Sequence, residues 1–226
     1  EPAAVQASVP PDWNARLAKA ATLPKEELLA AYLGAGQEAN GVEDRATALS
    51  HFKAAWAIAK DLPERDLRRI DVQEGLAAAT DSELEQRQAL NHIILELTLP
   101  QGAERARVAS AKEQLSYTDL PAPERIELLR DAVALRSDGA SGLDPGLSYT
   151  RLSLAQALDE SGDAAGAEAV LRVRISSLPT PDAADRSRKA LQDRVQQVMA
   201  RIDLAWFLID HARATDAQEV ARQALQ

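Results

Sequence analysis

The sequence predicts an all-α protein built as an α-solenoid, a stack of antiparallel helix pairs. Alanine is abundant while aromatic residues make up only 4% of 226 residues, a composition that favours close-packed helices over sheets. Apolar residues recur at helical spacing between turn signals along most of the chain. A segment also repeats after fifty residues with every apolar position in register: Arg151-Leu152-x-Leu154-Ala155-x-x-Leu158 returns as Arg201-Ile202-x-Leu204-Ala205-x-x-Leu208. Such self-similarity is typical of stacked supersecondary units.

The N-terminal part of the chain predicts three helices. Residues 1–10 are rich in proline and small residues, and we expect them to be disordered. A short helix is expected over 11–21 and a second over 24–40, where Asn40-Gly41 suits the left-handed conformation that ends a helix. The next helix carries apolar residues at 3.6-residue spacing and stops at Pro63, because proline cannot continue it.

The remaining helices are expected in pairs. They cover about 67–79 and 82–99, then 103–117 and 124–135, then 147–161 and 164–178. Residues 137–146 hold three glycines and a proline and predict a flexible connection. A last pair begins at Asp182, which can cap a helix reaching Arg213, and ends with 216–226. We therefore assign one helical repeat domain, 11–226, with approximate repeats 24–63, 66–100, 103–137, 147–179 and 182–226.

The fourth repeat carries a pattern that resembles the tetratricopeptide repeat (TPR) family: Leu154-Ala155, Leu158, Gly162-Asp163, Ala167, Leu171 and Pro179. The first repeat adds Leu33-Gly34, Ala48, Phe52, Ala55 and Trp56. Arg125 and Arg174 stand where the family prefers alanine, so the repeats are degenerate. The resemblance implies a right-handed TPR-like superhelix. The fifty-residue offset exceeds the family's 34 by 16, so the region 182–213 is expected to form one long helix or two.

Small residues are expected where antiparallel helices approach most closely, because larger side chains would push the helices apart. The large aromatic side chains of Phe52 and Trp56 are expected in the core. The alanines at close approaches are Ala48, Ala155, Ala167, Ala205 and Ala217.

Charge and composition argue against several classes of function. A net charge of −9 would repel a phosphate backbone, so nucleic acid is not an expected partner. No apolar run approaches the roughly 18 residues of a membrane span, and the absence of cysteine excludes thiol catalysis.

Known catalytic and cofactor motifs are also missing. Gly34-x-Gly36-x-x-Ala39 superficially matches a dinucleotide-binding fingerprint, but the preceding residues are helical rather than a strand. The three histidines, His51, His92 and His211, lack the spacing of metal ligands. Asp138 and Asp144 lack the other ligands of a calcium loop, so a plain connector is the better interpretation. We expect no enzyme activity, no cofactor and no metal.

The resemblance implies that the first helix of each pair lines a concave groove that binds a protein or peptide. Trp206 is the strongest candidate for a binding residue, because tryptophan is enriched at binding hot spots. It could equally pack against a further helix pair. The groove positions carried onto the last two repeats are Tyr149, Leu152, Gln156, Asp159, Ile202, Trp206, Ile209 and Asp210.

The leading hypothesis is a non-enzymatic scaffold that binds a partner protein. The alternative is a sensory or regulatory domain of a larger bacterial signalling protein. Self-association as a homodimer through the C-terminal helix is a third hypothesis. The start of the chain has no Met and is rich in proline, as after signal-peptide removal. This predicts a periplasmic or secreted protein, with a cytoplasmic location as the alternative.

Overall fold

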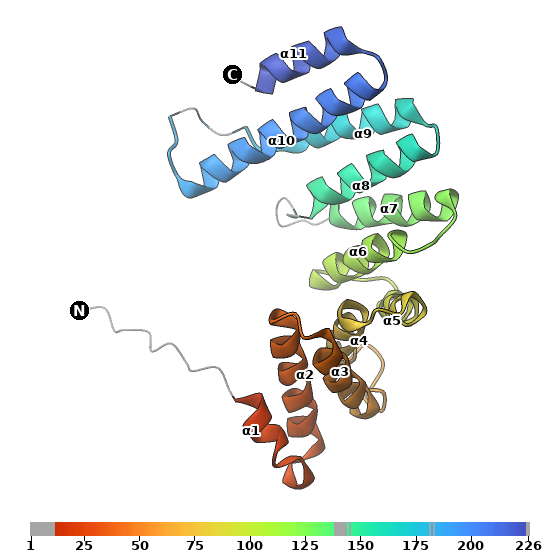
Figure 1. Ribbon diagram of the computed structural model, residues 1–226, viewed down its shortest axis with the longest axis vertical. Coiled ribbons are helices and arrows are strands. Elements are labelled where there is room, and N and C mark those ends of the chain that lie inside the picture. Colours follow the sequence, from red (N-terminus) through yellow and green to blue (C-terminus); the bar gives the residue numbers. More distant parts are fainter. Residues whose placement is uncertain (1–11, 138–143, 145, 181, 183, 225–226) are drawn as a thin grey trace, which may run out of the picture. The chain divides into compact units, whose positions relative to one another are not determined.

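The computed structural model describes residues 12–137, 144, 146–180, 182 and 184–224 (Figure 1). All regular elements of this part of the chain are helices. The first are the short α1 (Trp13–Leu17) and the 3-10 helix η1 (Ala20–Thr22). The prediction of one helix over 11–21 is wrong because the amide and hydroxyl of Thr22 both donate to the Lys19 carbonyl, which closes a tight turn there. The expected disordered segment 1–10 lies outside the described residues.

The other helices pack as consecutive pairs joined by short turns (Figure 1). This confirms the prediction of an all-α stack of antiparallel helix pairs. Two compact units divide the chain between Leu99 and Pro100, whereas the boundaries of a single repeat domain stay a prediction. The pairs of the first unit are α2 (Lys25–Gly41) with α3 (Arg45–Ala59) and α4 (Leu67–Ala79) with α5 (Glu83–Glu96). Those of the second are α6 (Ala103–Ser116) with α7 (Ala122–Ser137), α8 (Leu147–Glu160) with α9 (Ala164–Ser177), and α10 (Arg188–Asp210) with α11 (Ala214–Ala224).

One turn geometry joins three of these pairs. Its central residue is left-handed: Glu43 (φ 63°), Gly162 (φ 88°) and Ala212 (φ 57°). The amide after Gly162 donates to the Leu158 carbonyl at 2.9 Å, and the amide after Ala212 donates to the Leu208 carbonyl at 2.8 Å. The fifty-residue repetition in sequence is therefore also a repetition of backbone hydrogen bonds.

The end of α2 differs from the prediction. The helix runs through Gly41, and the left-handed residue is Glu43 rather than the Asn40-Gly41 pair. The amide of Val42 still donates to carbonyls of the last helical turn, and the carboxylate of Asp44 then caps α3 by accepting from the Thr47 amide at 3.1 Å.

Part of the added length of the last repeat lies in one long helix and the rest lies in the segment before it, so the region contains one helix rather than two. Helix α10 has 23 residues where α8 has 14, and it begins at Arg188 rather than at Asp182. Asp182 instead accepts from the Ala184 amide at 2.9 Å, while Ser187 caps α10 through the Ala190 amide at 3.1 Å. None of the helices within the described ranges is both long and apolar enough to cross a membrane.

The small residues lie at the predicted close approaches. Ala48, Ala155, Ala167, Ala205 and Ala217 are all buried, which confirms their assignment to helix contacts. In the second unit the last four join one core with leucines of α8, α9 and α10.

Aromatic rings and glycines fix the first unit. Phe52 is 2% exposed, as predicted, and its ring lies against the backbones of Gly36 and Gly75. Trp13 of α1 lies in the same way against Gly34. The prediction that Trp56 is a core residue is wrong in part, because its ring is only half-buried and lines a pocket.

Candidate functional site

The predicted groove residues lie on two first helices of the second unit, α8 and α10. Their buried faces share one core, which contains Leu154 of α8 and Leu204 of α10. The largest of the predicted side chains point to solvent, since Trp206 is 62% exposed and Tyr149 is 56% exposed. Gln156, Ile202, Ile209 and Asp210 are also exposed, whereas Leu152 is half-buried against the core.

Asp159 does not lie free in a groove. Its Oδ1 is 3.0 Å from Nε2 of His211, and the His211 ring stacks on Phe207 with 4.3 Å between centroids. This contact brings the C-terminal ends of α8 and α10 together. Asp159 is therefore part of a helix-to-helix link as well as a predicted groove position. The whole set stays a prediction as a binding site.

The structure extends the predicted groove positions of α10 into a longer apolar surface. Six large side chains of α10 are exposed between 37% and 62% and follow one another at intervals of four, four, three, four and three residues, so they form one stripe along the helix. The opposite face, with Ala200, Leu204 and Leu208, is buried in the core. We call these six residues the α10 stripe: Leu191, Val195, Met199, Ile202, Trp206 and Ile209.

The first three members of the α10 stripe escaped the sequence prediction for a simple reason. The family pattern supplies groove positions only inside a 34-residue unit, and Leu191 and Val195 lie in the added turns. Met199 lies inside the unit, fifty residues after the predicted Tyr149, but it was not carried over to the last repeat. The signal was present in the chain, because the same three- and four-residue spacing continues upstream of Ile202. Exposed apolar patches of this kind mark interaction sites more often than isolated surface leucines do.

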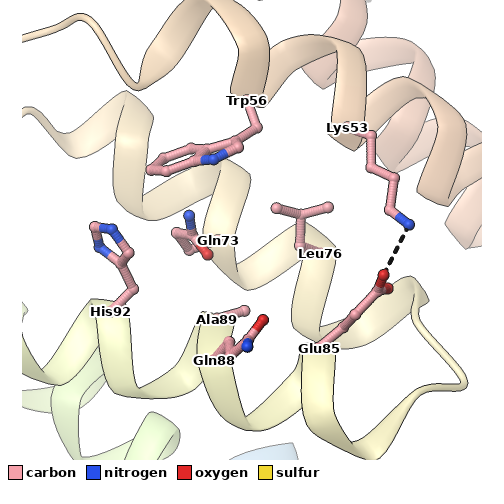
Figure 2. Close-up of a pocket in the computed structure, with 8 residues that line it drawn as sticks. All are labelled: Lys53, Trp56, Gln73, Leu76, Glu85, Gln88, Ala89 and His92. Atoms are coloured by element: carbon pink, nitrogen blue, oxygen red, sulfur yellow. Dashed lines mark hydrogen bonds and ion pairs between the residues drawn. The ribbon is translucent and has the colours of Figure 1, made fainter.

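A pocket of about 270 Å³ lies in the first unit. Its floor is α4, with Gln73 and Leu76, and its walls are α3 and α5 (Figure 2). Trp56 of α3 faces His92 of α5 edge-on, with 5.2 Å between ring centroids. The predicted groove residues all lie on α8 and α10 of the second unit, so the pocket is a separate site from them.

The charged groups around the pocket are already paired. At one end, Nζ of Lys53 donates to Glu85 at 3.0 Å (Figure 2), and the Thr80 hydroxyl donates to the same carboxylate at 2.8 Å. These two hydrogen bonds hold the pKa of Glu85 below its usual value, and the bond from Lys53 has the larger effect. Behind Trp56, Nη2 of Arg69 is 2.5 Å from Glu96.

His92 of the pocket has its Nδ1 2.8 Å from Oε1 of Glu96, but three other polar side chains of the pocket are not paired. Gln73 is only 4% exposed, yet its side-chain amide makes no hydrogen bond to any residue the structure describes. The indole N–H of Trp56 and the amide of Gln88 likewise have no partner among those residues. The pocket therefore combines an apolar wall with unused amide-type donors and acceptors.

Groups suited to metal binding do not converge within the described ranges, where no three histidine or carboxylate side chains lie close enough to share an ion. Asp144, which the sequence placed in a plain connector, instead accepts from Arg136 at 2.9 Å and from the Gly146 amide at 2.7 Å. It therefore anchors the start of α8. Asp138 lies outside the described residues.

Solved structures with the same architecture decide the fold. Over 90% of this chain and 95% of the other, the structure superposes with a TM-score of 0.69 on the TPR-like repeats of a putative kinesin light chain from Podosopora anserina, at 18% identity. This is a tetratricopeptide-like fold. BtubC from P. vanneervenii matches with a TM-score of 0.61 at 21% identity, over 77% of this chain and 75% of that one. MamA matches with a TM-score of 0.56 at 13% identity, over 87% and 90%.

Sequence comparison gives no closer relationship. No family model matches the tetratricopeptide-like chain, and no curated protein does. At these identities the structural likeness establishes the fold alone, and the function must be argued from the surfaces.

Proposed function

We propose that this protein is a non-enzymatic scaffold that binds an amphipathic helix of a partner protein on the α10 stripe. The observation that carries the proposal is the length of the stripe: apolar side chains are exposed from the first turn of α10 to its last. Val195, Met199, Ile202, Trp206 and Ile209 follow the alternating four- and three-residue spacing of a coiled-coil seam. A second helix matches that spacing along its whole length, whereas an extended peptide does not.

Charge at the two ends of the stripe supports one orientation of the partner. Arg188 is exposed at the N-terminal end of α10 and Asp210 at the C-terminal end, about 33 Å apart at the helical rise of about 1.5 Å per residue. A bound helix with acidic residues beside Arg188 and basic residues beside Asp210 is favoured electrostatically.

The test is partner binding by a double variant, Val195→Glu with Ile202→Glu. Two charges on the seam should weaken binding at least tenfold, because apolar anchors at the centre of an interface typically contribute more than about 1 kcal/mol each. The matched control is Leu84→Glu, since Leu84 is 67% exposed on α5 and lies outside the stripe. The measurement is co-purification from extracts of the producing cells, followed by calorimetry with the purified partner.

A partner that the double variant and the control retain equally would remove the α10 stripe as the binding surface. Sedimentation separates a second outcome. A wild-type dimer that the double variant converts to a monomer would show that the occupant is another copy of this chain, as in the homodimer hypothesis. Export of the chain and a role as a sensory domain stay predictions.

A further inference from the structure

We propose that the pocket between α3, α4 and α5 binds one apolar residue of an extended peptide and hydrogen-bonds its main-chain amide through Gln73 and Gln88. This site is separate from the α10 stripe and does not depend on the function proposed for it. It would give the scaffold a second contact, for a short linear segment rather than a helix.

The size of the pocket fits a side chain rather than a cofactor. A volume of about 270 Å³ lies at the lower end of the roughly 300–1,000 Å³ range of small-molecule sites and has room for one side chain with its main-chain amide. Its apolar lining consists of the Trp56 indole, Leu76 and Ala89 (Figure 2). An aliphatic side chain inserted between these groups would remove its own surface and that of the half-buried indole from water.

The amide of Gln73 indicates what else the ligand carries. The residue is 4% exposed, but neither atom of its amide is among the fully buried polar atoms without a partner, so the amide reaches the open space of the pocket, where a ligand group can pair with it. The Gln73 amide offers both a donor and an acceptor, and a peptide group offers the complementary acceptor and donor. Gln88 of α5 lines the same pocket, and the indole N–H of Trp56 provides a further donor (Figure 2).

The charges around the pocket argue for a neutral ligand. Lys53 is engaged by Glu85, and Arg69 is engaged by Glu96, so neither cation is available to a phosphate or carboxylate without breaking an existing pair. The Glu85 carboxylate would also repel an anion entering beside it. These pairs select against nucleotides and free amino acids and in favour of an uncharged peptide segment.

The experiment uses the full chain and N-acetyl-leucinamide, a neutral molecule with one apolar side chain and two amide groups. The probe should cause a saturable shift of the Trp56 indole N–H signal in NMR spectra, with a dissociation constant on the order of 1 mM for so small a ligand. The indole signals of Trp13 and Trp206, assigned through Trp→Phe variants, should not move. Free leucine, which carries both charges, should bind at least tenfold more weakly.

Two variants separate amide recognition from simple apolar binding. Gln73→Leu removes the amide at the floor of the pocket and should weaken binding of the probe at least tenfold. Gln88→Leu, at an exposed position that folding tolerates, should weaken it severalfold. The control Gln218→Leu, exposed on α11, should bind as the wild type does. The Val195→Glu, Ile202→Glu variant should also bind normally, which keeps this test independent of the α10 stripe.

Three results would overturn the proposal. The first is no saturable shift of the Trp56 signal up to the solubility of the probe. The second is equal binding of free leucine and of the amide. The third is unchanged affinity in both folded glutamine variants, which would leave an apolar pocket that does not recognise a peptide group.

Discussion

Arg174 occupies a position where the repeat family prefers alanine, and it is 2% exposed. Its guanidinium donates to Ser148 of α8 at 2.9 Å and to Asp203 of α10 at 2.5 Å, so one side chain of α9 ties together three successive helices. Arg136 of α7 repeats the arrangement one pair earlier, with Ser110 of α6. The family's small residue is therefore replaced by a polar link, which its surroundings satisfy.

We predict that Arg174→Met lowers the free energy of unfolding by about 1–3 kcal/mol, because Asp203 and Ser148 are left without their donor. Asp203→Leu should be destabilising for the converse reason. The double variant should be less destabilised than the sum of the two, since no unpaired charge remains. Urea denaturation of the four proteins measures the coupling. Strict additivity would show that the Arg174–Asp203 contact contributes little.

Individual residues also show where sequence reasoning stops. The helical pattern located Ala167 and Phe52 in the core, because the spacing of apolar residues along a helix shows which of its faces is buried. The pattern could not reveal that Gly34 and Gly36 are small in order to admit Trp13 and Phe52, since those contacts join separate helices. Nor could it place Gln73 beside Trp56, because a pocket depends on the packing of three helices.

At the scale of elements, the turns are more regular than the sequence. The α8–α9 and α10–α11 turns share their hydrogen bonds, yet one has Gly162 and the other Ala212 at the left-handed position. An L-residue is disfavoured in that conformation by its Cβ atom, whereas glycine is not. A Cβ atom at Gly162 would meet nothing within 4 Å, so backbone conformation alone distinguishes the two sites.

We therefore predict that Ala212→Gly stabilises the protein by about 1 kcal/mol and that Gly162→Ala destabilises it by a similar amount. The gain is limited because glycine also loses more conformational freedom on folding. Thermal and chemical denaturation of both variants measure the changes. If Ala212→Gly lowered stability, the conformational entropy that glycine loses on folding would outweigh the strain of the left-handed conformation at residue 212.

At the scale of the whole molecule, the chain consists of neighbouring helix pairs in two compact units. Stability in such a protein is approximately the sum of the intrinsic stabilities of the repeats and of the contacts between adjacent repeats. The fold class was predictable because each helix carries its own periodicity and stop signals. The division at Leu99 was not, because it reflects how densely neighbouring helices pack rather than any residue type at the boundary.

A core substitution in one unit is predicted to destabilise mainly that unit. A Cβ atom at Gly75 would lie 2.3 Å from Cε1 of the buried Phe52 ring, so Gly75→Ala should destabilise the first unit by about 1–3 kcal/mol through overpacking, despite the higher helix propensity of alanine. Ala167→Phe should act similarly in the second unit, where Ala167 is fully buried. Gly41→Ala is the matched control, since its Cβ atom would meet nothing within 4 Å.

Native-state hydrogen exchange resolves where protection is lost. Gly75→Ala should lower the protection of amides in α2–α4 and leave α8–α10 close to the wild type, whereas Ala167→Phe should do the reverse. The reason is that each substitution strains contacts only with adjacent helices, and opening of one helix pair does not require opening of a distant pair. Equal loss of protection in both units with either variant would instead mean that the chain unfolds as one cooperative block. A ligand bound at the α10 stripe would then stabilise the pocket helices of the first unit as much as the helices of the second.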